Sequence, residues 1–189
     1  GVFAGCTMLN NVFVDINNPV LSDVDGILFD KNITEIKFYP TARVGEYVLP
    51  DTVTKIGNGV FQGKTSLKKI TIGNKIDQIG DNAFKGCTSL TDVVFITDGR
   101  AENATLVLGA SAFYGCTVLE NINIPSGVTE IPNQLFYNCL ALSDFALTNG
   151  ITEIGKEAFY DCNGFTGTRL QSFLQLRRTR KNRIRARRR

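Results

Sequence analysis

The sequence contains no histidine among its 189 residues. This absence excludes Ser-His-Asp and Cys-His catalysis and every histidine-ligated metal site. Tryptophan is absent as well, and methionine occurs once. No apolar run approaches the roughly 20 residues that a membrane-spanning helix needs. No basic-then-apolar leader opens the chain, so we expect any signal peptide to have been removed or to lie outside this sequence.

Motifs that carry enzyme chemistry are also missing. The sequence has no phosphate loop, no cofactor fingerprint and no nucleophile paired with a base. Glycoside hydrolysis needs two carboxyl groups in a cleft, one with a raised pKa. The acids Asp77, Glu130 and Glu153 instead recur at solvent-facing positions of a repeat. We therefore expect no enzyme, no cofactor and no metal site.

The formal net charge of +3 combines two parts of opposite sign. Residues 1–167 carry 11 lysines and arginines against 18 acids, a balance of −7. Residues 168–189 carry 10 basic residues and no acid, a balance of +10. A hydrophobic share of 43% is enough to bury a core. The chain therefore divides into an acidic body and a basic tail, which need separate explanations.

A Phe-x-x-Cys unit recurs along the acidic body. Its phenylalanines are separated by 58, 23, 29, 23 and 23 residues, so a 23-residue period is interrupted by one large and one six-residue insertion. In one copy, Lys64 stands where the cysteine should be. The pairs are Phe3/Cys6, Phe61/Lys64, Phe84/Cys87, Phe113/Cys116, Phe136/Cys139 and Phe159/Cys162.

Aligned on this period, one unit reads Val-Thr-x-Ile-Gly-x-x-x-Phe-x-Gly-Cys-Thr-x-Leu-x-x-Ile-x-Ile. Residues 53–72, 76–95 and 128–147 are copies, residues 151–165 begin another, and residues 1–14 match the second half of a unit. Leu-x-x-Ile-x-Ile and Val-x-x-Ile fit short strands, and phenylalanine closes the coil from a helical or 3₁₀ turn. One coil cannot bury its apolar face alone, but stacked coils can, with strands about 4.8 Å apart.

Two columns of glycine mark corners of the coil. The first follows phenylalanine by two residues and becomes Asn138 and Asp161 in the last copies. Because Gly, Asn and Asp tolerate positive φ, we predict a left-handed corner there. The second column is interrupted by Pro132 and marks another corner; its members are Gly57, Gly80, Gly109 and Gly155.

The motif order resembles leucine-rich repeats of the BspA-like type, also called the Treponema pallidum type. The resemblance covers roughly residues 1–167 and departs from the family at Lys64, at Pro132 and in lacking a recognisable terminal cap. It implies a β-rich solenoid, a right-handed leucine-rich-repeat superhelix of about six coils of about 23 residues with a β-hairpin insertion. Because the repeats start and stop in mid-unit, we expect a fragment of a longer array, or a monomer.

The resemblance also implies a function. Proteins of this type are surface or secreted proteins of bacteria and some parasitic protists, and several adhere to host, matrix or neighbouring-cell proteins. We therefore expect an extracellular or cell-surface, non-catalytic module that binds a protein partner, with no membrane span in this chain.

The large insertion lies within residues 14–50. We predict that it forms a β-hairpin between coils, at about residues 15–50 of the solenoid domain. Residues 27–29 and 34–39 are strand-like and flank the turn residues 30–32. Repeat proteins of the type that the sequence resembles often carry such an excursion.

Three aspartates cluster in this insertion: Asp23, Asp25 and Asp30. A calcium loop is one interpretation. The cluster lacks the spaced ligands and distal glutamate of an EF-hand, so we interpret the aspartates as turn residues.

The presence of five cysteines suggests a disulfide framework as one interpretation. The repeat argues against it, because ladder positions in neighbouring coils would have parallel Cβ vectors, which a disulfide does not favour. Convergent C-x-x-C pairs for zinc are absent. We predict free, buried thiols. Lys64 supports this, and it predicts a less buried corner where the lysine head reaches water.

The outward positions of the Leu-x-x-Ile-x-Ile strands predict one contact surface, which we call the contact stripe. A solvated sheet face explains each residue alone, but solenoids commonly bind partners along such a face. The stripe is small and polar, so we expect modest or avidity-driven binding. It consists of Lys69, Thr71, Asp92, Val94, Asn121, Asn123, Asp144 and Ala146.

The basic tail, residues 168–189, breaks the repeat and leaves three alternatives open. It is a disordered extension, the product of a shifted reading frame, or an arm that binds nucleic acid or another polyanion. The last alternative predicts steep salt dependence and loss of binding when the tail is deleted. Its candidate contacts are Arg177, Arg178, Arg180, Lys181, Arg183 and Arg185.

Overall fold

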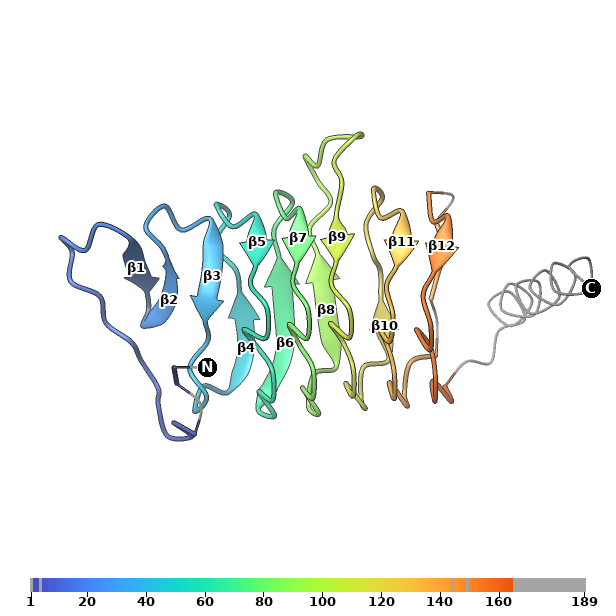
Figure 1. The fold of residues 1–189 in the computed structure, drawn as a ribbon, viewed down its shortest axis with the longest axis horizontal. Coiled ribbons are helices and arrows are strands. Elements are labelled where there is room, and N and C mark those ends of the chain that lie inside the picture. Colours follow the sequence, from blue (N-terminus) through green and yellow to red (C-terminus); the bar gives the residue numbers. More distant parts are fainter. Residues whose placement is uncertain (1, 4, 144, 149, 165–189) are drawn as a thin grey trace, which may run out of the picture.

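The computed structural model describes residues 2–3, 5–143, 145–148 and 150–164 (Figure 1). Within them the chain forms short strands and no helix. The strands are β1 Leu21–Val24, β2 Ile27–Asp30, β3 Glu35–Phe38, β4 Gly45–Val48, β5 Lys55–Ile56, β6 Leu67–Ile72, β7 Gln78–Ile79, β8 Asp92–Phe95, β9 Val107–Leu108, β10 Asn121–Ile122, β11 Glu130–Ile131 and β12 Glu153–Ile154.

The strands form the walls of a solenoid. The first sheet has the order β1-β2-β3-β5-β7-β9, the second sheet has the order β10-β8-β6-β4, and β11 pairs with β12. Only the β1–β2 and β2–β3 pairs are antiparallel; the other pairs are parallel and join successive coils. Figure 1 shows the coils side by side along the long axis. The predicted β-rich solenoid is confirmed.

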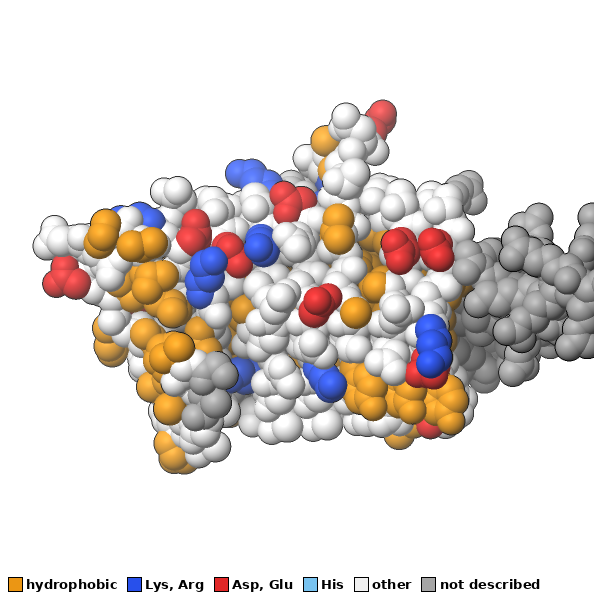
Figure 2. Space-filling view, in the orientation of Figure 1, with side chains coloured by type: hydrophobic (Ala, Val, Ile, Leu, Met, Phe, Trp, Pro, Cys, Tyr) orange, Lys and Arg blue, Asp and Glu red, His pale blue; other side chains and the backbone are white. Residues whose placement is uncertain are grey.

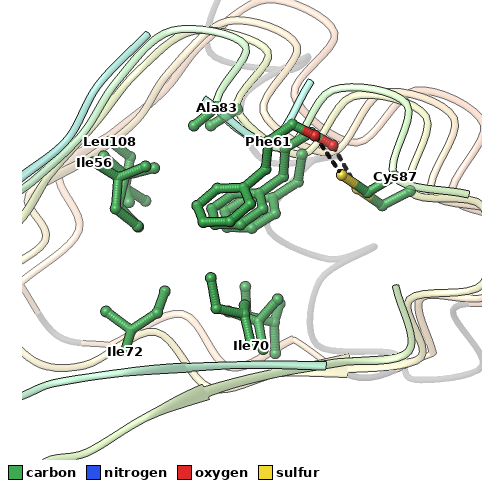
Figure 3. Close-up of a cluster of buried hydrophobic side chains, with 14 of the residues drawn as sticks. Ile56, Phe61, Ile70, Ile72, Ala83, Cys87 and Leu108 are labelled. Atoms are coloured by element: carbon green, nitrogen blue, oxygen red, sulfur yellow. Dashed lines mark hydrogen bonds between the residues drawn. The ribbon is translucent and has the colours of Figure 1, made fainter. Parts of the chain in front are cut away.

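Columns of apolar side chains fill the space between the walls (Figure 3). Ile56 and Leu108 point inward from the first sheet, and Ile70 and Ile72 point inward from β6. Between them lies a column of phenylalanine rings whose centroids are 4.9, 5.2 and 5.5 Å apart. This burial is the main stabilising contribution, because each coil covers the apolar face of the next. The rings that define these distances are Phe61, Phe84, Phe113 and Phe136.

The phenylalanine turns form a third, hydrogen-bonded side of the coil. The Phe61 amide donates to the Ala83 carbonyl at 2.8 Å, and the Phe84 amide donates to Ala112 at 2.7 Å. The two following coils repeat this bond. These bonds between coils satisfy part of the backbone of each turn. Other groups pair within the turn, as where the Lys64 amide donates to the Phe61 carbonyl at 3.1 Å. The expected helical or 3₁₀ turn is an ordinary turn here.

The two glycine columns serve different purposes. The first has positive φ, between 68° and 83° at its glycines and 60° and 56° at Asn138 and Asp161, as predicted. The glycines of the second column do not have positive φ. At Gly109 an added Cβ would overlap the backbone of Asp81 and Gly80 in the preceding coil, so this column permits close approach between coils. A further positive-φ column, which the sequence analysis missed, comprises Gly59, Asn82, Ser111, Gln134 and Glu157.

The predicted hairpin in the insertion is confirmed, but the excursion is shorter than residues 15–50. β1, β2 and β3 form an antiparallel meander. β3 then pairs in parallel with β5, and β4 pairs in parallel with β6. Residues 33–50 are therefore a coil of the solenoid itself. Tyr39 takes the place of a column phenylalanine, with its ring 4.9 Å from that of Phe61.

The aspartates of the insertion accept backbone hydrogen bonds, as turn residues do. Asp23 accepts from the Val14 amide at 2.8 Å, and Asp30 Oδ1 accepts from the Thr34 amide at 2.7 Å and the Glu35 amide at 2.6 Å. Asp25 lies in the turn between β1 and β2 with φ of 50°, as predicted. Asp23 and Asp30 belong to β1 and β2, so for these two the prediction is corrected: their side chains accept hydrogen bonds from neighbouring segments while their backbone is in a strand.

Pro132 interrupts the first sheet. At the equivalent position of other coils, Gly80, Gly109 and Gly155 donate their amide to the preceding coil at 2.9, 2.7 and 2.7 Å. Proline has no N–H, so this bond is absent, and β9 and β11 belong to separate sheets.

The six-residue insertion projects as a loop between β8 and β9 (Figure 1). Arg100 fastens it to the preceding coil: its guanidinium donates to the carbonyls of Asn74 at 2.9 Å and Ile76 at 2.8 Å. The same group donates to the Thr105 carbonyl at 3.0 Å within the loop. The extra residues therefore leave the inner columns in register.

The N-terminal segment repeats the phenylalanine turn but does not extend the column. The Cys6 amide donates to Phe3, as the Cys87 amide does to Phe84. However, Cys6 is exposed and the Phe3 ring packs on Phe38 with centroids 4.4 Å apart. Residues 9–14 then cross the end of the solenoid, where Arg43 donates to the Asn10 carbonyl at 3.1 Å, to Asn11 Oδ1 at 2.9 Å and to the Asp25 carbonyl. The basic tail lies outside the described residues.

Candidate functional site

The contact stripe lies on the outer face of the second sheet. Lys69 and Thr71 project from β6, Asp92 and Val94 from β8, and Asn121 from β10, and all are half-buried or exposed. The parallel register places Lys69 beside Asp92 and Asp92 beside Asn121, so these side chains form a row across three coils.

The outward row continues from β6 onto β4, one coil beyond the predicted stripe. At the other end, the row of strand residues stops at β10. Glu46 of β4 lies beside Lys69, with Oε2 4.0 Å from Nζ, and Val48 lies beside Thr71. Asn123 follows β10 and is exposed. Ala146 is exposed but belongs to no strand, and Asp144 lies outside the described residues. The stripe therefore has a charged row and a more apolar row, and can offer hydrogen bonds and apolar contacts to a partner.

The cysteines form the predicted ladder of free thiols. Cys87, Cys116 and Cys139 are fully buried, and each Sγ donates to a phenylalanine carbonyl of the preceding coil at 2.9, 3.2 and 3.1 Å (Figure 3). Burial raises the pKa of the Cys87 thiol to about 12, and it also raises the pKa values of Cys116 and Cys139 well above the usual range of a thiol. These thiols are therefore protonated and inert rather than nucleophilic.

The expectation that Lys64 reaches water is wrong. Its side chain is 7% exposed, Nζ donates to Thr41 Oγ1 at 2.8 Å, and Nζ lies 5.0 Å from the centre of the Phe38 ring. Burial lowers the pKa of this ammonium. The coil formed by residues 33–50 covers the corner, and the sequence analysis had treated those residues as an excursion.

A second candidate surface was missed by the sequence analysis. Tyr114, Tyr137 and Tyr160 stack with centroids 4.7 and 4.8 Å apart, and Lys85 Nζ lies 4.7 Å from the Tyr114 ring centre. The signal was a tyrosine directly after the column phenylalanine at 23-residue spacing. Figure 2 shows hydrophobic side chains gathered over the β1–β2 end and over the last described coils of this face. Because tyrosine is enriched in interfaces, this tyrosine column is a rival to the stripe.

The described part of the chain shows no metal cluster and no membrane-spanning helix. It contains no group of three or more Cys, Asp or Glu side chains that could hold a metal ion. No helix among these residues has the length and apolarity to span a membrane.

Known proteins show the same repeat. The family model for the BspA type leucine rich repeat region matches residues 31–166, in six copies. A leucine rich repeat protein of T. pallidum is 30% identical, with a TM-score of 0.61 over 69% of this chain and 60% of that chain. A leucine rich cell surface protein of Faecalibacterium prausnitzii is 26% identical, with a TM-score of 0.74 over 90% of this chain and 45% of that chain.

Another structure shares the fold. The pneumococcal vaccine antigen PcpA is 22% identical, with a TM-score of 0.67 over 84% of this chain and 40% of that chain. No curated protein matches the chain.

These similarities define a leucine-rich-repeat protein, and proteins with this repeat are generally non-catalytic protein-interaction modules. The chain belongs to the BspA-type leucine-rich-repeat family. It spans 60% of the T. pallidum protein and 45% of the F. prausnitzii protein.

Proposed function

We propose that the chain is a non-catalytic module of a cell-surface or secreted protein that binds a host, matrix or neighbouring-cell protein through the contact stripe. The observation that carries this proposal is the register of the second sheet, which aligns Lys69, Asp92 and Asn121 across successive coils. The F. prausnitzii relative is described as a cell surface protein, which supports the location.

The composition of the stripe sets the expected strength. Val48 is 63% exposed and Val94 is 40% exposed, so the second row offers apolar contacts beside the polar one. The stripe has no tyrosine, tryptophan or arginine anchor of the kind that dominates tight interfaces. We therefore expect weak binding by a single module, strengthened when several modules act together.

Two valines provide a matched test. Val94 lies on the second sheet and Val107, 60% exposed, lies on the first sheet. We expect V94R to weaken binding to a panel of immobilised extracellular-matrix proteins at least tenfold, and V107R to leave it unchanged, as measured by surface plasmon resonance. Equal effects of both variants would contradict the stripe. If Y137A weakened binding and V94R did not, the contact surface would be the tyrosine column.

The basic tail offers the alternative function of nucleic-acid or polyanion binding. Residues 168–189 carry 10 basic residues, which would neutralise phosphates or sulfates and give steep salt dependence. Binding to immobilised heparin and to double-stranded DNA should then fall steeply with salt and disappear when these residues are deleted. Salt-tolerant binding to a matrix protein that survives the deletion supports the stripe instead.

A further inference from the structure

We propose that a groove beside Lys64 binds a carboxylate carried on an apolar group. The groove has a volume of about 680 Å³, within the usual range for small-ligand sites. It lies between the N-terminal turn, the Phe38 region and the first complete phenylalanine turn. None of its lining residues belongs to the contact stripe or the tyrosine column, so this inference does not rest on the proposed function.

Lys64 supplies the charge that the ligand would meet. Its side chain is 7% exposed, and it forms no salt bridge within the described residues. The two groups that Nζ contacts, Thr41 Oγ1 at 2.8 Å and the Phe38 ring at 5.0 Å, both line the groove, which places the ammonium at its wall. A buried ammonium without an anionic partner is costly, and a bound carboxylate would offset that cost.

The rest of the lining suits an apolar group next to the carboxylate. The Phe3 and Phe38 rings, 4.4 Å apart, and the side chain of Val60 provide apolar surface. Asn58 and Gln62 add amide groups that can donate to an oxygen. Lys37 also lines the groove, but its Nζ already contacts Glu35 at 2.6 Å. Lys64 is therefore the cation that remains to be paired.

The position of Lys64 in the repeat argues that its charge is not needed for the fold. Cys87, Cys116 and Cys139 hold the same position and complete the core as small buried thiols. Burial lowers the pKa of Lys64, because the protein interior disfavours the charged ammonium. Cysteine at residue 64 would satisfy the repeat, so the lysine is suited to a ligand rather than to packing.

The test titrates the full chain with 3-phenylpropanoate and, in parallel, with the neutral 3-phenylpropan-1-ol, following amide shifts by NMR. We expect the carboxylate to bind at least tenfold more tightly than the alcohol. K64C installs the residue that the repeat has at this position, and K64M keeps the side-chain length without the charge. Each variant should bind the carboxylate at least tenfold more weakly than the wild type does. K85M, which removes a half-buried lysine one coil away and outside the groove, should bind as the wild type does.

Three results would overturn the proposal: no saturable binding by the wild type, equal binding of the alcohol, or undiminished binding by a folded K64C or K64M. Thermal melts establish that each variant is folded, and K64C is expected to be at least as stable as the wild type. If both variants failed to fold, the comparison of the carboxylate with the alcohol in the wild type would still show whether the groove binds a carboxylate. Stripe variants such as V94R serve as an independent control and should leave this binding unchanged.

Discussion

At the scale of single residues, the chain uses side chains to link one coil to the next. Asn58 Oδ1 accepts from the Asp81 amide at 2.9 Å, and Asp81 Oδ1 accepts from the Ala110 amide at 2.8 Å. Inside the core the cysteine thiols also link coils, but they donate to backbone carbonyls of the preceding coil. The repeat predicted buried free thiols, because it fixes their position. It could not predict the surroundings of Lys64, which depend on a coil of atypical sequence.

The thiols should differ sharply in reactivity. Cys6 is exposed, whereas Cys87, Cys116 and Cys139 are fully buried and their pKa values are raised. At pH 8 we expect Ellman's reagent to label Cys6 within minutes and the three buried thiols only on unfolding. The same reaction in guanidinium chloride, where all five thiols should react, is the control. Rapid labelling of the buried thiols in native protein would contradict the ladder.

The Asp30 carboxylate should make the hairpin sensitive to acid. Burial alone would raise its pKa, but hydrogen bonds from Glu35 and Thr34 outweigh burial and lower it below 3.8. A lowered pKa gives a stabilisation that is complete above 3.8 and is lost as pH falls through the folded value. D30A should therefore cost about 1–3 kcal/mol at pH 7, and chemical denaturation should show this cost shrinking below pH 3.8.

Asp51 provides the control for this pH dependence. It is exposed and has no side-chain hydrogen bond to the described residues. We expect D51A to change the free energy of unfolding by less than about 0.5 kcal/mol at either pH. A D30A cost that persisted unchanged in acid would show that the carboxylate charge is not responsible.

At the scale of elements, the short strands and their turns follow from the repeat, and the departures have identifiable causes. The hairpin and β6 were predicted, because alternation and turn residues mark them. The coil of residues 33–50 was missed, although Ile33-Thr34-Glu35-Ile36 matches the start of a repeat. Its turn has Tyr39 in place of phenylalanine and lacks the Gly-Cys pair, so the motif that set the register was absent.

Gly109 should be the more sensitive of two glycines tested. An added Cβ there would overlap the backbone of Asp81 and Gly80, which has no freedom to move away. At Gly73 the nearest atom to such a Cβ, the Asp51 Cα, is 3.9 Å away. We expect G109A to destabilise by about 1–3 kcal/mol or more and G73A to be nearly neutral, as measured by guanidinium unfolding. Equal effects would show that the coils do not approach as closely as described.

At the scale of the whole molecule, each coil contacts its neighbours, and stability is expected to accumulate along the stack. The sequence predicted the architecture, and it predicted which positions of β6, β8 and β10 face outward. It did not predict the tyrosine column as a surface or the groove beside Lys64. The tyrosines of the column follow the repeat and were not considered as a surface. The groove beside Lys64 arises where the N-terminal turn meets coils that are distant from it in sequence.

Phe113 tests the continuity of the stack. Its ring is fully buried between Phe84 and Phe136, at 5.2 and 5.5 Å. F113A should cost about 3–5 kcal/mol, and hydrogen exchange should accelerate in the coils on both sides. F13A provides the control, because Phe13 is 80% exposed. A single, local increase in exchange around residue 113 would argue against coupling along the column.

The loop of residues 96–105 shows where this architecture can accept additional chain. It adds six residues to one coil, projects away from the sheets, and is tied down at its base by Arg100. A coil can therefore change its length at this corner while its neighbours keep their spacing. We therefore expect a foreign peptide grafted between Asp98 and Gly99 to be displayed at a fixed position along the stack, without disturbing the columns of the core.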